Sequence, residues 1–349
     1  MDLVILKNYL LPFLAAFFIS LILTFLIRRL SLALKIIDQP KEPRKIHQFP
    51  VPLLGGLAVY FTFLLVTLVF YQAGYLLDGK IKPAYLLAML IAGAVLMVGG
   101  YFDDKYKLKP IQQFICPVLA VLIVLASGLA IGYVSNPLGG LWYLAGTFWS
   151  PLLIFVWLLG MMYTTKFLDG LDGLVTGISA IGAIILFLVS LFWDVPLSGT
   201  SILCLILAGA AFGFLVWNFY PAKIFLGEGG SLFLGFSLGV LSIISGAKIA
   251  TALLIMGIPI LDVAWVIIRR IFKEKKSAFL GDAKHLHFRL LSAGLNQRQA
   301  VLLLYLLTLV FGAASLFQQT VGKLVTLGIL LLTMVLLGWW VIYRYKKRA

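Results

Sequence analysis

Long, nearly uninterrupted apolar segments recur along the whole chain, and they limit the possible folds more than any other feature. A membrane core about 30 Å thick is crossed by about 20 helical residues, and lipid offers no partner to an unpaired backbone amide. Hydrophobic residues make up 62% of the 349 residues and charged residues only 12%, whereas soluble domains are about a quarter charged. We therefore expect an all-α, polytopic membrane protein, because a β-barrel would show short alternating segments.

We find eleven apolar segments of transmembrane length, at about 8–27, 53–71, 83–101, 112–134, 149–165, 174–193, 199–218, 229–246, 249–268, 299–317 and 323–343. The polar stretches between them are too short to build a soluble core of their own. The chain is therefore predicted to form one integral membrane domain over residues 1–349.

Lys and Arg are distributed unevenly between the two sets of loops. Most of the 28 lie near 28–52, 102–111, 166–173, 219–228 and 269–298 or in the C-terminal tail, all on one face of the expected bundle. Cytoplasmic loops carry such an excess, so we expect the N-terminus outside the cell and the C-terminus in the cytoplasm, in the plasma (inner) membrane. The net charge of +15 then reflects topology and anionic lipid headgroups, and no nucleic acid partner is needed.

Most acidic residues and all three histidines fall on the same face as the basic loops. Acidic residues contribute little to the rule that orients membrane proteins, so their gathering on one face has another cause. We infer a single assembled site at the cytoplasmic surface of the membrane.

Two stretches place paired acids where apolar segments end. FDDK puts Asp103 and Asp104 side by side, where they repel one another or share a cation; a solvated helix end is the alternative. KFLDGLDGL starts with Lys166 and puts Asp169 and Asp172 on one face if it is helical, with glycines that would let a ligand approach the backbone. A helix cap would need only one of these two aspartates, so we favour a binding role.

Two later loops add candidates. NFYPAKIFLGEGGS contains Asn218 and surrounds Glu228 with glycines, which suits binding of a metal or an anion, or a simple glycine loop. GDAKHLHFRL contains His285, His287 and Arg289. These suit phosphate recognition better than zinc, because no cysteine is near; a solvated basic loop is the alternative.

The first loop carries Arg44, Lys45 and His47, in the stretch DQPKEPRKIHQFPVPLLGG. It is either a binding loop or a solvated loop whose basic residues only orient the protein in the membrane. Asp262 lies within an apolar segment, in IPILDVAWVIIRR. An ionisable residue there is a functional candidate, and pairing with one of the two following arginines is the alternative.

Five of these stretches resemble, in order and over residues 38–298, the motifs of the polyprenyl-phosphate N-acetylhexosamine-1-phosphate transferases: DQPKEPRKIHQFPVPLLGG, FDD, LDGLDGL, NFYPAKIFLGEGGSLFLGF and KHLHFRL. The pattern is most similar to the bacterial members that initiate teichoic acid, enterobacterial antigen or O-antigen synthesis. The resemblance implies transfer of a sugar 1-phosphate, such as N-acetylglucosamine 1-phosphate, from a UDP-sugar to undecaprenyl phosphate, with release of UMP. It also implies Mg²⁺ as cofactor, with Mn²⁺ as a substitute, which suits a reaction between two phosphate-bearing partners.

By position in these motifs, the resemblance implies a role for each candidate. Asp103 and Asp104 correspond to the catalytic pair that activates the lipid phosphate, and Asp104 and Glu228 to the surroundings of the metal. Substrate binding falls to Arg44, Lys45, His47, Lys166, Asp169, Asp172, Asn218, His285, His287 and Arg289.

Three positions depart from the family pattern. Lys166 stands where the family has an Asn that ligates the metal in some members, Glu228 replaces an Asp, and Phe288 replaces a third His. An ammonium group cannot ligate Mg²⁺. We hypothesise that Lys166 either supplies a fixed positive charge beside the phosphates or pairs with an acid of the site, while Glu228 still binds the metal.

Two other functions stay open. The changes at Lys166 and Glu228 would permit an inactive family member that serves as an assembly subunit. A transporter of a phosphorylated substrate would place ionisable residues at the membrane midplane, which this sequence does not favour. The sequence also leaves open whether two copies form a homodimer.

Overall fold

Helices dominate the computed structural model, which describes residues 3–40, 49–76, 81–136, 139–193, 198–246, 248–275 and 285–348. The elements in chain order are α1 (Leu3–Ala33), β1 (Ile37–Asp38), β2 (Val51–Pro52), α2 (Gly55–Gln72), α3 (Pro83–Tyr106), α4 (Pro110–Gln113), α5 (Ile115–Ala126), β3 (Tyr133–Ser135), β4 (Leu141–Tyr143), α6 (Trp149–Leu168), α7 (Leu174–Trp193), α8 (Gly199–Asn218), α9 (Gly227–Ile244), α10 (Ile249–Ile255), α11 (Gly257–Ile268), η1 (Arg269–Lys273), α12 (Leu286–Ser292), α13 (Gln297–Ala314), η2 (Ser315–Phe317) and α14 (Thr320–Arg348). Within the described ranges, nine helices are long and apolar enough to cross a membrane, and the bent pair α10–α11 brings the number to ten. The prediction of an all-α, polytopic membrane protein is confirmed.

The predicted number of eleven spans differs from the structure at the fourth segment, 112–134. This segment contains only the short helices α4 and α5, of which the second ends at Ala126. Gly128 then adopts a φ of 81°, which stops a helix and which glycine tolerates without strain. The chain continues into β3, which pairs with β4 in an antiparallel hairpin. The segment is therefore a shorter apolar helix than the hydrophobic run alone suggested.

The ninth predicted segment, 249–268, is broken rather than straight. Helices α10 and α11 meet near Met256 at an angle of 77°. Pro259 lies in the first turn of α11 and has no N–H to donate back to α10, which favours a kink or break at this point. The bend sets α11 beside the start of α12, where the Leu286 N–H donates to Asp262 at 2.8 Å.

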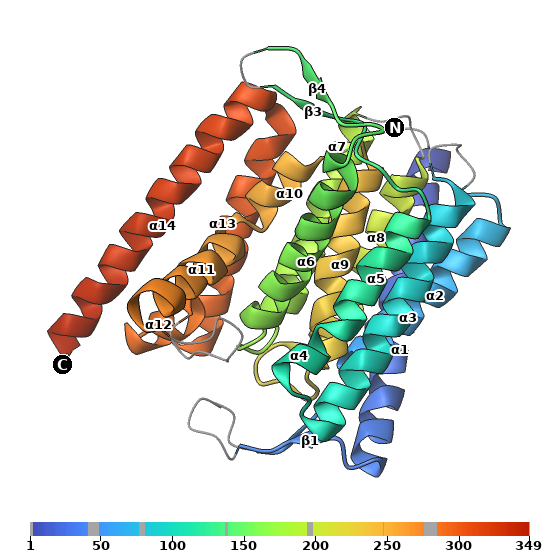
Figure 1. Ribbon diagram of the computed structural model, residues 1–349. Helices are drawn as coiled ribbons and strands as arrows, with labels where there is room; N and C mark the ends of the chain where they lie inside the picture. The colour runs from blue at the N-terminus through green and yellow to red at the C-terminus, as the bar shows by residue number, and fades with distance from the viewer. Residues whose placement is uncertain are drawn as a thin grey trace.

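The helices α8 and α9 form the centre of the bundle. In the most apolar window of α9, 89% of the residues are buried, against 17% in α14, which lies along the outside (Figure 1). Helix α1 packs closely on α8, because a Cβ at Gly209 or Gly213 would overlap a carbonyl oxygen of α1. Small residues that let helix backbones approach one another stabilise helix pairs in lipid, where apolar burial alone does not.

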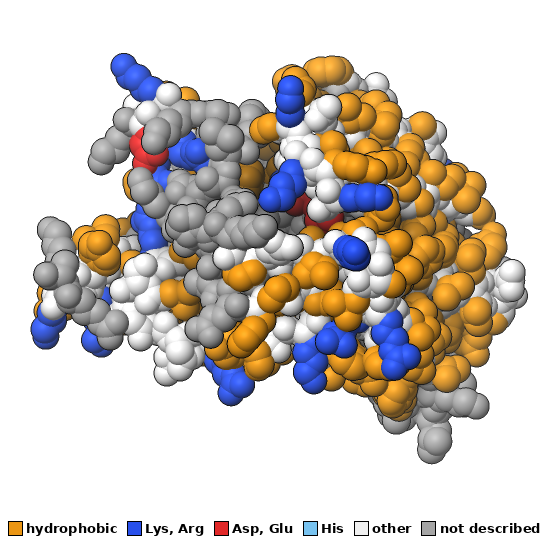
Figure 2. All heavy atoms as spheres, turned by 90° about the horizontal axis from the view of Figure 1, so that it is seen from below, with side chains coloured by type: hydrophobic (Ala, Val, Ile, Leu, Met, Phe, Trp, Pro, Cys, Tyr) orange, Lys and Arg blue, Asp and Glu red, His pale blue; other side chains and the backbone are white. Residues whose placement is uncertain are grey.

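The two ends of the bundle carry different structures. The N- and C-termini lie at opposite ends, with α4, β1 and α12 at one end and the β3–β4 hairpin at the other (Figure 1). Seen from the first end, acidic side chains lie recessed in a hollow bordered by Lys and Arg (Figure 2). This end carries the loops that we predict to be cytoplasmic, and the orientation in the cell stays a prediction.

Candidate active site

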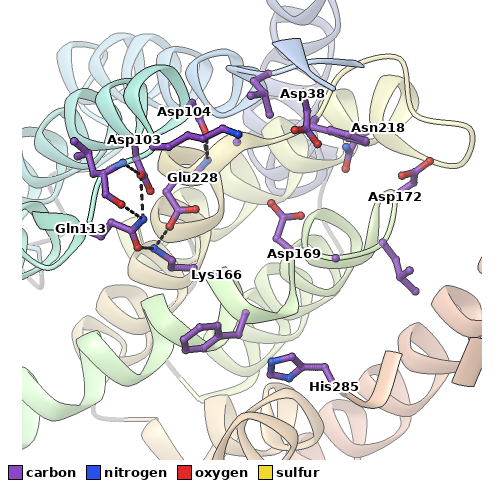
Figure 3. A pocket seen from close by; sticks show the side chains of 18 of the residues that line it. Asp38, Asp103, Asp104, Gln113, Lys166, Asp169, Asp172, Asn218, Glu228 and His285 are labelled. Carbon is purple, nitrogen blue, oxygen red and sulfur yellow. Dashed lines mark hydrogen bonds and ion pairs between the residues drawn. The ribbon is translucent and has the colours of Figure 1, made fainter. Parts of the chain in front are cut away.

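A cavity of about 480 Å³ opens at the end of the bundle that carries α4 and α12. Its wall is built by α3, α4, the turn between α6 and α7, the end of α8, and the starts of α9 and α12. It brings together eight of the predicted site residues, namely Asp103, Asp104, Lys166, Asp169, Asp172, Asn218, Glu228 and His285. Loops that are far apart in the sequence therefore do converge on one site (Figure 3).

Two further predicted residues that the structure describes, His287 and Arg289, do not line this cavity. Both lie in α12, and His287 is only 1% exposed. The predicted residues Arg44, Lys45 and His47 lie outside the described residues. For His287 and Arg289, the predicted contact with substrate is therefore not supported by a position at the cavity.

Backbone contact between α3 and α9 positions the acids at one side of the cavity. A Cβ at Gly100 would overlap the backbone nitrogen of Gly229, so the two helices touch without intervening side chains. One turn beyond Gly100, both carboxylate oxygens of Asp104 accept the N–H of Glu228, at 3.2 and 3.3 Å. The first N–H groups of a helix have no partner within the helix, so Asp104 supplies an acceptor to α9. Gly229 beside Glu228 thus serves helix packing, a role that was not expected from the sequence.

We expect Gly100→Ala to lower the stability of the folded protein by about 1–3 kcal/mol, the usual cost of overpacking. The added methyl group has to push α3 away from α9, since its neighbour is backbone and cannot rotate aside. A fall in the thermal unfolding temperature in detergent measures the effect. The matched control is Gly160→Ala, whose Cβ on α6 would meet nothing within 4 Å. Equal unfolding temperatures for the two variants would contradict the backbone contact.

A chain of polar contacts joins Lys166 to three other residues of the wall. Its ammonium forms an ion pair with Glu228 and donates to Oε1 of Gln113 at 2.8 Å. The Gln113 amide nitrogen in turn donates to Oδ1 of Asp103 at 3.0 Å, and Asp103 also accepts the N–H of Leu108 at 2.9 Å. Figure 3 shows these contacts as dashed lines. The structure thus supports one branch of our hypothesis, in which Lys166 pairs with an acid of the site.

Asp169 and Asp172 lie in a turn rather than on a helix. Helix α6 ends at Leu168 and α7 begins at Leu174, so the expected helical face does not exist, although both aspartates line the cavity. Gly170 also differs from expectation, because a Cβ there would overlap Nε2 of His287. This glycine makes room for α12 as well as lining the cavity.

Asp169 holds its proton unusually tightly. Desolvation by the surrounding protein, followed by repulsion from Glu228 and Asp172, raises the pKa of this carboxyl from 3.8 to about 8. The side chain nevertheless faces the cavity and is exposed there to water, which moderates the effect. The raised pKa increases the protonated share of Asp169 near neutral pH and so lowers the negative charge that an anionic ligand meets.

This pKa gives a prediction for stability against pH. Because the folded pKa lies above the ordinary value of 3.8, the proton on Asp169 stabilises the fold fully below 3.8, and this contribution is lost as the pH rises to about 8. Asp169→Asn cannot titrate, so its unfolding temperature relative to wild type should rise between these values and level off above them. Thermal unfolding in buffers with a chelator measures the difference. In an Asp172→Asn background, the pH range over which this difference in unfolding temperature changes should shift to lower pH, because one repelling charge is gone. A difference between Asp169→Asn and wild type that does not vary with pH would contradict the raised pKa.

Asn218 and Asp172 hold the loop that precedes α9. The Asn218 amide nitrogen donates to the carbonyl of Ile224 at 3.0 Å, and its oxygen accepts from Thr176 at 2.8 Å. Oδ2 of Asp172 accepts the N–H of Ala222 at 2.9 Å. These contacts place the loop at the cavity, so both residues have a structural role in addition to any contact with substrate.

From the sequence, Gln113 received no role and Asp262 no correct partner. Gln113 lies in a stretch without any charge pattern, and nothing in that stretch singles it out. Asp262 was a candidate with an arginine as its alternative partner, whereas its carboxylate lies 2.9 Å from Nδ1 of His285. The position of an acid inside an apolar segment was the only sequence signal that pointed to it.

A cavity with six acids and two lysines in its wall, at the end of a bundle of helices long enough to span a membrane, defines a class of protein: a polytopic membrane enzyme. Residues 86–246 match the model of glycosyl transferase family 4. The chain is 31% identical to a protein of Bacillus subtilis (strain 168) named "Probable undecaprenyl-phosphate N-acetylglucosaminyl 1-phosphate transferase", over 93% of this chain and 88% of the relative.

Further relatives carry similar names. The "Decaprenyl-phosphate N-acetylglucosaminephosphotransferase" of Mycobacterium leprae (strain TN) is 33% identical over 92% of this chain and 87% of its own length. The "Undecaprenyl-phosphate alpha-N-acetylglucosaminyl 1-phosphate transferase" of Salmonella typhi is 26% identical over 95% and 92%. The chain therefore belongs to the polyprenyl-phosphate N-acetylglucosamine-1-phosphate transferases, as its motifs predicted.

Proposed function

We propose that this enzyme transfers N-acetylglucosamine 1-phosphate, or a related N-acetylhexosamine 1-phosphate, from a UDP-sugar to undecaprenyl phosphate on the cytoplasmic face of the plasma membrane. UMP is the second product, and the lipid-linked sugar starts the synthesis of a cell-surface glycan. The observation that carries the proposal is the convergence of Asp103, Asp104, Lys166, Asp169 and Glu228 on one cavity at the end of the bundle. At this end of the bundle the phosphate of a membrane lipid could enter the cavity, and the sugar nucleotide would enter it from water.

In the proposed reaction an oxygen of the lipid phosphate attacks the β-phosphorus of the UDP-sugar. A new phosphorus–oxygen bond forms, the bond from the β-phosphorus to the bridging oxygen breaks, and UMP leaves with that oxygen. Asp103 would keep the lipid phosphate deprotonated, because its carboxylate lies at the cavity and is held by Gln113 and Leu108. Lys107 and Lys166 also line the cavity and supply positive charge beside the phosphates.

Mg²⁺ belongs to this proposal. In the described part of the chain no three His, Cys, Asp or Glu side chains form a group that could hold a metal alone. Mg²⁺, however, commonly takes only one or two carboxylates and completes its shell with water and substrate phosphates. Asp104 and Glu228 both line the cavity where α3 contacts α9, and their carboxylates would supply these ligands. Bound there, Mg²⁺ would neutralise charge on the diphosphate.

Purified protein in lipid nanodiscs with undecaprenyl phosphate and a panel of UDP-sugars tests the proposal through release of UMP. We expect UMP with UDP-N-acetylglucosamine or a related UDP-N-acetylhexosamine, together with an organic-soluble lipid that carries the sugar. Release that needs no lipid phosphate would indicate a hydrolase instead. If binding occurs but no donor yields UMP, the protein is an assembly subunit. Movement of unmodified substrate across sealed vesicles would favour a transporter.

A further inference from the structure

The carboxylate of Asp262 holds two groups at the start of α12. Its Oδ2 lies 2.9 Å from Nδ1 of His285, and its Oδ1 accepts the N–H of Leu286 at 2.8 Å. Both side chains are well buried, with Asp262 7% and His285 4% exposed. An ionised carboxylate can only accept, so Nδ1 of His285 has to be the donor in this contact.

Two neighbouring rings also hold the plane of the His285 ring. Phe167 stacks on it with ring centres 6.0 Å apart and planes inclined by 19°, and His287 stacks at 5.7 Å and 5°. The stacking sets the plane of the ring, and the contact of Nδ1 with Asp262 sets its orientation within that plane. Since Nδ1 faces Asp262, Nε2 is the nitrogen left to act on a ligand in the cavity, whose wall includes His285 (Figure 3).

His287 differs from His285 in its hydrogen bonds and in its position relative to the cavity. Neither of its ring nitrogens has a hydrogen-bond partner among the described residues. Burial, followed by repulsion from His285, lowers the pKa of His287 to about 3, so this ring is neutral at physiological pH. His287 packs against the turn that holds Gly170 and does not line the cavity. His287 is therefore not a source of positive charge for a ligand in the cavity.

We propose that Asp262 is a positioning residue that acts through His285, by fixing its Nδ1–H tautomer and presenting Nε2 to a phosphate group of the sugar nucleotide. When the ring is protonated, Nε2–H donates to a phosphate oxygen while Asp262 balances the charge. His287 supports the ring by packing alone. Because Asp262 also accepts the N–H of Leu286, the histidine and its helix are held as one unit. The inference rests on the proposed transfer reaction for the identity of the ligand.

Asp262→Asn separates this role from a purely structural one. The amide oxygen can still accept from Leu286, but the amide nitrogen can only donate, so Nδ1 of His285 has to lose its proton and the tautomer inverts. We expect kcat to fall about 10–100-fold, as for other residues that orient a functional histidine, with an unchanged KM for undecaprenyl phosphate and an unfolding temperature near that of wild type. His285→Gln should lose about as much, and the double variant no more than either, because the two act as a unit. Losses that multiply would overturn the proposal.

A second measurement does not depend on activity. The chain has only three histidines, so the ¹⁵N spectrum of histidine-labelled protein is simple, and the signal lost in His285→Gln identifies His285. We expect a protonated Nδ1 in wild type and an unprotonated one in Asp262→Asn; an unprotonated Nδ1 in wild type would overturn the proposal. Ser292→Ala, an exposed position of α12, is the control and should change neither kcat nor spectrum. Failure of the proposed function would appear separately, as a wild-type protein that releases no UMP.

Discussion

Lys166→Met is expected to abolish turnover and to destabilise the protein. The substitution removes the ammonium that pairs with Glu228, and the two side chains are only 13% and 23% exposed. Removing one partner of a fully buried ion pair costs about 3–5 kcal/mol, and the residual exposure of Glu228 reduces the expected loss here to about 2–3 kcal/mol. The thermal unfolding temperature measures the stability, and release of UMP measures the activity.

The double variant Lys166→Met/Glu228→Gln is the matched control. It removes both charges, so it should regain most of the lost stability and still fail to turn over, because the cavity lacks the cation and the acid. Recovery of activity in the double variant would contradict a role for the pair in the reaction. Lys166→Asn, which restores the residue of the family pattern, should alter the dependence of activity on Mg²⁺. If activity and Mg²⁺ dependence both stay unchanged, Lys166 has no role beside the phosphates.

Asp103→Asn is expected to lower kcat by about 100–10,000-fold, the range for removal of a general base. The fold should persist, because an asparagine oxygen can accept the same two hydrogen bonds, from Leu108 and Gln113. The variant therefore removes charge from the cavity without removing the contacts that hold the residue. Single-turnover release of UMP, with the unfolding temperature as a control for folding, measures the effect.

Gln113→Leu tests the contact that holds this carboxylate. It removes one of the two hydrogen bonds to Asp103 and one from Lys166, but no charge, so its loss of kcat should be clearly smaller than that of Asp103→Asn. Near wild-type turnover in Asp103→Asn would exclude Asp103 as the base. A larger loss in Gln113→Leu than in Asp103→Asn would show that the geometry of the network matters more than the carboxylate charge.

The length of the apolar runs predicted the spanning helices because a helix in lipid depends on local properties of the chain. Where the prediction differed, a local residue was still responsible: Gly128 ends the fourth segment early, and Pro259 bends the ninth. The site residues were found from motifs, since acids, glycines and histidines at the ends of apolar runs are unusual. Gln113 received no role and the partner of Asp262 was missed, because their contacts with Lys166 and His285 join residues that are far apart in the chain.

The sequence by itself determined an all-α membrane bundle with a charged end, and it marked Lys166 and Glu228 as two separate departures from the family pattern. Only the tertiary structure showed that these departures are one ion pair, and that Asp262 pairs with His285 rather than with an arginine. The physical reason is that helix formation depends on neighbours in the chain, whereas the meeting of side chains on different helices depends on how those helices pack. Here the backbone contact of Gly100 with Gly229 sets α3 against α9, and the break at Pro259 sets α11 beside the start of α12.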